Sequence, residues 1–143
     1  MPILYRVPVA VLRAGATLAL SLSLLGGSAL AADLKLGGDH EVPPVKTMAS
    51  GSGSIQVAAD GAVSGSVKTT GITATAAHIH AGAAGKNGPV VVPLTKGGEG
   101  EWVVPAGAKL NEAQMKQYKA GELYVNVHSA MHKDGEIRAQ LAP

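Results

Sequence analysis

Alternation of apolar and polar side chains marks the last part of the chain as paired β-strands. From residue 123 to residue 128, Leu or Val alternates with Tyr, Asn or His, and from residue 137 to residue 141, Ile, Ala or Leu alternates with Arg or Gln. Successive side chains of a strand point to opposite faces, so each segment has one face for the core and one that carries polar groups. The polar face is where the sequence predicts that any chemistry resides.

Short extended segments separated by Gly, Pro, Asp and Asn continue this pattern through the rest of the chain. The strands expected are residues 33–36, 53–58, 62–69, 76–80, 90–94, 101–104, 122–128 and 136–141. The Gly- and Ser-rich residues 50–54 are expected to form a turn into a strand. One helix is predicted, capped by Asn111 and ended by Gly121. Many short strands with turn residues between them predict an all-β sandwich or barrel with one short connecting helix.

The first 31 residues have the pattern of a secretory signal peptide. Arg6 and Arg13 precede an uncharged apolar run over residues 14–25, and the segment ends in the small-residue sequence Ala29-Leu30-Ala31. The run of about a dozen residues is short of the roughly 20 that span a bilayer, although an uncleaved anchor is the alternative. We therefore expect a signal peptide at 1–31, one mature domain at 32–143, a periplasmic or secreted location, and no membrane span after cleavage.

Charge and composition narrow the classes of function. The chain has 12 Lys and Arg against 10 Asp and Glu, and two of the arginines lie in the expected signal peptide, so the mature domain is formally neutral. With no basic cluster and 3% aromatic residues, nothing indicates a nucleic-acid partner. The absence of cysteine excludes thiolate metal sites and cysteine nucleophiles. No Gly-x-Ser-x-Gly elbow or phosphate loop is present, so the sequence leans against an enzyme without deciding the question.

The histidines are the candidate functional residues. His78 and His80 are alternate residues of one predicted strand, so both imidazoles can point to one cation, and His128 lies on the polar face of another strand. His132 and Met131 follow across a short turn and complete the predicted metal ligands. Imidazole donors without thiolate suit copper, with zinc as the alternative, and the thioether of Met131 suits Cu(I).

The same histidines also have a metal-free interpretation. His78 and His80 can instead hydrogen-bond loop carbonyls and tie a Gly-rich turn to the sandwich. If a metal is bound, Asp134 or Glu136 is expected to orient one imidazole from behind. His40 is expected to be solvated, and the sequence leaves open whether it joins the site.

Four motifs in order resemble the CHRD (chordin-type) domain, which is found in chordin and in exported bacterial proteins. They are Glu-Val-Pro-Pro-Val at 41–45, Ala-His-Ile-His-Ala-Gly at 77–82, Asn-Gly-Pro-Val-Val-Val at 87–92, and Ala-Gly-Glu-Leu-Tyr-Val-Asn-Val-His at 120–128 with Gly-Glu-Ile-Arg at 135–138. The resemblance implies a Greek-key-like antiparallel sandwich and no settled biochemical activity. The short His-x-His-x-Gly segment is also similar to the copper-binding strand of copper/zinc superoxide dismutases.

Three functions follow as hypotheses. The first is an exported, non-catalytic metal-binding module, with copper as the first choice. The second is a metal-free structural or interaction domain whose protein partner the sequence does not identify. The third is a copper-dependent enzyme similar to superoxide dismutase, in which Arg138 or Lys133 would attract the anion.

Overall fold

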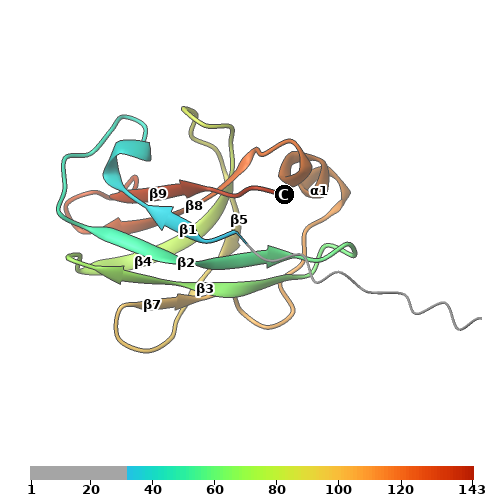
Figure 1. Cartoon of the computed structure of the whole chain (residues 1–143), viewed down its shortest axis with the longest axis horizontal. Helices are drawn as coiled ribbons and strands as arrows, with labels where there is room; N and C mark the ends of the chain where they lie inside the picture. Colours follow the sequence, from blue (N-terminus) through green and yellow to red (C-terminus); the bar gives the residue numbers. More distant parts are fainter. Residues whose placement is uncertain (1–31) are drawn as a thin grey trace, which may run out of the picture.

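Two antiparallel sheets packed face to face form the fold. The structure is a computed structural model that describes residues 32–143, and the expected signal peptide lies outside the described residues. One sheet has the strand order β1-β2-β3-β7-β6 and the other β5-β4-β8-β9 (Figure 1). The strands are β1 (Leu34–Leu36), β2 (Ser50–Val57), β3 (Val63–Thr70), β4 (Ala74–Ala81), β5 (Val90–Pro93), β6 (Thr95–Lys96), β7 (Glu101–Val103), β8 (Leu123–Ser129) and β9 (Ile137–Gln140). The prediction of an all-β sandwich with one connecting helix is confirmed.

The chain crosses between the two sheets three times, and a bridge joins the sheets at one edge. It passes from β3 to β4, returns from β5 to β6 through the buried Leu94, and crosses again from β7 to β8 through α1 (Glu112–Lys119). At the other edge, an antiparallel bridge between Gly37 and Arg138 joins the end of β1 to β9. A short 3-10 helix, Gly38–His40, follows this bridge and leads into the Glu-Val-Pro-Pro segment.

The core is built from the apolar positions of the alternating pattern. Its completely buried aliphatic side chains come from β3, β4, β8 and β9, and they are Val67, Ile79, Leu123, Val125, Val127 and Ile137. Ile79 points into this core between His78 and His80, so the two imidazoles lie on the opposite face of β4. The fold thereby fixes the direction of both histidines.

The connecting helix α1 begins and ends as its sequence predicts. The Asn111 side chain accepts a hydrogen bond from the backbone N–H of Gln114 (2.9 Å), and the Gln114 side chain accepts one from the backbone of Asn111 (2.8 Å). Gly121 follows the helix with a φ of +73°, a left-handed conformation that favours glycine. Among residues 32–143, no helix combines the length and apolar character needed to cross a membrane.

Residues 50–53 belong to β2, where a turn was expected. Over this stretch β2 pairs with β3 on one side and with β1 on the other, Ser52 lying opposite Lys68 and Lys35. A Cβ atom at Gly53 would collide with the backbone of Ser66. The glycines here therefore serve close approach between strands, a role that composition alone does not distinguish from a turn.

We expect Leu123→Ala to lower the free energy of unfolding by about 2–5 kcal/mol, because Leu123 is completely buried and its truncation leaves a cavity. Urea unfolding followed by circular dichroism measures the change. Val90→Ala on β5 is the matched control: Val90 is 50% exposed, and its truncation should change stability by no more than about 0.5 kcal/mol. Equal losses from the two variants would contradict this description of the core.

Candidate metal centre

The outer face of the sheet β5-β4-β8-β9 is polar, and much of it is buried. Every residue of β8 is buried, including those on its polar side. The cluster that we call the polar face consists of the outward side chains of three adjacent strands: His78, His80, Tyr124, Asn126, His128, Arg138 and Gln140. These groups must therefore find partners within the protein.

Loops from three parts of the chain cover the polar face. The β4–β5 loop approaches from one side, and its Gly88 donates a backbone hydrogen bond to the hydroxyl of Tyr124 (3.1 Å). The β8–β9 loop approaches from the other end, where Asn126 donates to the backbone carbonyl of Asp134 (3.3 Å). The segment at 41–45 connects to the first loop, because the carbonyl of Val42 accepts a hydrogen bond from the Asn87 side chain (2.7 Å).

Three imidazoles converge at one place on the polar face. His78 and His80 come from β4 and His128 from the neighbouring strand β8, and one ring nitrogen from each lies within 4.8 Å of the others. His78 Nδ1 and His128 Nε2 are 2.9 Å apart, which is a direct hydrogen bond. His80 and His128 are buried, whereas His78 is half-buried and gives the group its contact with solvent.

Backbone carbonyls hold two of these rings by their Nδ1 atoms. His80 Nδ1 donates to the carbonyl of Gly88 (2.9 Å), and His128 Nδ1 donates to the carbonyl of Lys133 (2.8 Å). In a neutral imidazole this leaves Nε2 without a proton and available as a donor to a cation. The orienting groups are thus main-chain carbonyls. Among the described residues, neither Asp134 nor Glu136, the carboxylates expected to orient an imidazole, bonds to these rings, and Glu136 accepts a hydrogen bond from Thr47 (2.6 Å).

Burial and mutual repulsion keep two of the imidazoles neutral. Desolvation lowers the pKa of His78, and the neighbouring His128 and His80 lower it further. Desolvation also lowers the pKa of His80, although its hydrogen bond to the carbonyl of Gly88 acts in the opposite direction. Neutral imidazole is the form that coordinates metals, so the pair is in its metal-binding protonation state at pH 7.

An aromatic stack fixes the His80 ring from the side. The rings of His80 and Tyr124 are nearly parallel, at 4° with centroids 4.9 Å apart. Arg138, from the strand on the other side of β8, places its guanidinium carbon 3.4 Å from the centroid of Tyr124. This cation–π contact lets the Arg138 charge be buried to 1% exposure without a bonded carboxylate partner among the described residues.

Comparison with known proteins identifies the family of the chain. The family model described as CHRD domain matches residues 33–141. The chain belongs to the CHRD domain family. Searches of curated proteins and of solved structures gave no match.

Two predicted ligands of this CHRD domain lie outside the group of three histidines. The Met131 side chain is 88% exposed on the β8–β9 loop. His132 lies on the same loop, where its backbone is hydrogen-bonded to the backbone of Ser129. Its imidazole lies near Glu136 and contributes to lowering the pKa of that carboxyl. The geometry does not bring Met131 or His132 to the group, and their metal roles stay predictions.

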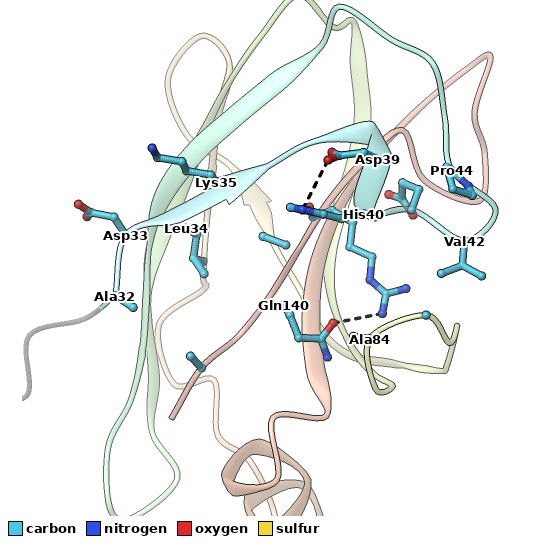
Figure 2. Close-up of a pocket in the computed structure, with 15 residues that line it drawn as sticks. Ala32, Asp33, Leu34, Lys35, Asp39, His40, Val42, Pro44, Ala84 and Gln140 are labelled. Atoms are coloured by element: carbon cyan, nitrogen blue, oxygen red, sulfur yellow. Dashed lines mark hydrogen bonds and ion pairs between the residues drawn. The ribbon is translucent and has the colours of Figure 1, made fainter.

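His40 lies beside a separate cavity of the CHRD domain. A cavity of about 650 Å³ opens between β1, β9 and the β4–β5 loop. Figure 2 shows the side chains around it, which include Leu34, Val42, Pro44, Ala84, His40 and Gln140. His40 is exposed, as the sequence predicted, with its side chain 56% accessible. It hydrogen-bonds the backbone carbonyl of Arg138 (3.1 Å), pairs with Asp39 (3.7 Å) and does not join the three histidines.

Glu41 is a buried member of the network that sequence reasoning did not single out. Its side chain is 4% exposed, and burial raises its pKa from 4.5 to about 7, although the Arg138 guanidinium and the Asn126 amide act in the opposite direction. The sequence marks Glu41 as part of the Glu-Val-Pro-Pro motif, but the motif does not indicate that the side chain is buried. Tyr124 and Arg138 were visible as outward residues of their strands, but their stacking with His80 was not.

We expect Glu41→Gln to remove a pH-dependent loss of stability. In the wild type the unfolded chain ionises Glu41 near pH 4.5 and the folded chain near pH 7, so the folded state loses stability as pH rises between these values. Relative to wild type, the free energy of unfolding of the variant should therefore rise by up to about 3 kcal/mol from pH 4 to pH 8. This is the effect of a pKa raised from 4.5 to about 7, at roughly 1.36 kcal/mol for each pH unit.

Urea unfolding of both proteins from pH 4 to pH 8 tests this. The difference between the proteins cancels the contributions of the histidines, which both contain. A difference that is constant with pH would contradict the raised pKa of Glu41.

Proposed function

We propose that this CHRD domain is an exported, non-catalytic metal-binding module that takes copper, with zinc as the alternative ion. One observation supports the proposal above all: three imidazoles from two neighbouring strands offer nitrogens within 4.8 Å of one another. The chain has no cysteine, so imidazole nitrogens rather than thiolates are its donors for a transition metal. Three imidazoles at one point are typical of copper and zinc sites.

The spacing of the nitrogens suits a transition metal. With metal–nitrogen bonds of about 2.0–2.1 Å, two ligands at a right angle are about 2.9 Å apart and two at a tetrahedral angle about 3.3 Å. His78 Nδ1 and His128 Nε2 are separated by 2.9 Å. A cation can therefore replace the proton that these two atoms share. The longer separations, which reach 4.8 Å, exceed the tetrahedral value, so the rings must move closer together for all three to bind one ion.

The protonation states of the three histidines favour metal binding at neutral pH. The carbonyls of Gly88 and Lys133 fix the tautomers of His80 and His128 with Nε2 unprotonated, and the lowered pKa values of His78 and His80 reduce competition by protons. Nitrogen donors bind Cu(II) more tightly than Zn(II) in the usual order of divalent ions, which supports copper as the ion.

The expected signal peptide at 1–31 supports a role outside the cytoplasm. A periplasmic or secreted module with these donors would store, deliver or sequester copper. Of the two cationic residues in the superoxide dismutase hypothesis, the Arg138 guanidinium is buried and bonded to Asn87, Ala83 and Gln140. Lys133 is exposed on the β8–β9 loop, so any attraction of an anion from solvent would fall to Lys133.

The double substitution His78→Ala and His80→Ala tests the proposal. We expect the wild type to bind one Cu(II) per chain with nitrogen hyperfine structure in its electron paramagnetic resonance spectrum. The double variant should lose about hundredfold or more in affinity, because two of three ligands are gone. Competition titration against a chelator of known affinity measures the change.

His40→Ala is the matched control, since His40 lies outside the group, and it should bind Cu(II) like the wild type. A double variant that melts at a lower temperature but binds Cu(II) with unchanged affinity would contradict the proposal. That result would instead support the metal-free structural hypothesis.

A further inference from the structure

Three buried side-chain atoms without a hydrogen-bond partner lie on the polar face or in the segment that covers it. They are Glu41 Oε1, His80 Nε2 and Asn126 Oδ1, and the three side chains are 4%, 9% and 1% exposed. Leaving such an atom unpaired costs about 1–3 kcal/mol each. Among residues 32–143 these are the only buried side-chain nitrogens and oxygens in this condition, so their occurrence together requires an explanation.

The register of the strands places Asn126 in the middle of the three histidines. Asn126 is directly opposite His78 in the pairing of β4 with β8, His80 is diagonal to it, and His128 is two residues along the same strand. Directly opposite residues have Cβ atoms about 4.5–5.5 Å apart, and diagonal neighbours remain within reach of long side chains. Asn126 is therefore the residue of β8 that is adjacent to all three imidazoles.

The surroundings of Asn126 fix which way its amide points. Its Nδ2 donates to the carbonyl of Asp134, and the amide also lies beside the carboxyl of Glu41. Gly135 leaves room for both groups: a Cβ atom at Gly135 would lie 2.5 Å from Asn126 Nδ2 and 2.5 Å from Glu41 Oε1. With its NH₂ group turned to this side, the amide turns its oxygen toward the histidines.

With His80 neutral, Asn126 Oδ1 and His80 Nε2 are two acceptors with no hydrogen between them, whereas a protonated His80 would donate Nε2–H to Oδ1. The Asn126 amide lies beside the His80 imidazole, whose Nδ1–H is already given to the carbonyl of Gly88. Neither Oδ1 nor the bare Nε2 can donate to the other. A cation coordinated by both atoms satisfies the two of them at once.

We propose that Asn126 Oδ1 is the fourth protein ligand of the metal held by His78, His80 and His128. The inference rests on the proposed function and specifies its site as three imidazole nitrogens and one amide oxygen, a closed set of four for a divalent copper or zinc ion. It assigns the position opposite His78 to Asn126 and excludes Met131 and His132 from the first four ligands.

Exchanging the acid and the amide tests this assignment. In the double variant Glu41→Gln with Asn126→Asp, the amide introduced at position 41 can donate to the new carboxylate, and the net charge equals that of the wild type. Moving the carboxylate onto the metal should tighten Zn(II) binding by about tenfold relative to Glu41→Gln alone. The double variant Glu41→Gln with Asn126→Leu should weaken it by about tenfold.

Two measurements decide the outcome: competition titration with Zn(II), and the visible absorption of the Co(II)-loaded protein, whose bands depend on the ligands. We expect the Co(II) bands of both double variants to differ from those of Glu41→Gln. Should the Leu variant not fold, the Asp variant alone decides. Unchanged Zn(II) affinity and unchanged Co(II) bands would overturn the role of Asn126 while three-histidine binding stands. A wild-type protein that binds neither Zn(II) nor Cu(II) would overturn both proposals.

Discussion

Burial of β8 on both faces is the constraint from which the architecture of the polar face follows. One side of the strand contributes Leu123, Val125 and Val127 to the core, as alternation requires. The other side carries Tyr, Asn and His, and it is shielded from water as well. Polar groups without water must be paired inside the protein, so the loops that cover this face have to supply hydrogen-bond partners as well as volume. They do so mainly with backbone groups, the carbonyls of Gly88, Lys133 and Asp134.

The same constraint explains how a charged side chain is accommodated here. Arg138 is among the most completely buried side chains, and it is stabilised by the Tyr124 ring and by oxygens of the covering loop. The Arg138 charge lowers the pKa of the nearby Glu41 carboxyl, but burial has the larger effect and raises that pKa to about 7. The desolvation of the carboxylate therefore outweighs the attraction of the guanidinium, as is common for buried charges that do not meet in a close pair.

The sequence predicted those parts of the site that depend on strand periodicity. The common face of His78 and His80, with Ile79 in the core, follows from alternation alone, and so does the outward position of His128. Adjacency of β4 and β8 is a long-range pairing, and the register that sets Asn126 opposite His78 is not visible in either strand by itself. Nor are the carbonyls of Gly88 and Lys133, because a backbone acceptor can belong to any residue. A side chain in a loop, such as Met131, carries no periodic signal, and spacing along the chain brought it near His128 only in sequence.

The hydrogen bonding of the three imidazoles is itself an argument about function. If these histidines served only to tie loops to the sheet, each buried ring nitrogen would be expected to have a partner. His128 fits that expectation, with Nδ1 bonded to Lys133 and Nε2 to His78, but His80 does not. Its Nε2 is buried and unpaired, beside an equally unpaired amide oxygen on Asn126. An aliphatic side chain at position 80 would avoid this cost but would leave the carbonyl of Gly88 without its hydrogen bond. A structural role therefore explains the bond to Gly88, and the proposed ligand role explains the unpaired Nε2.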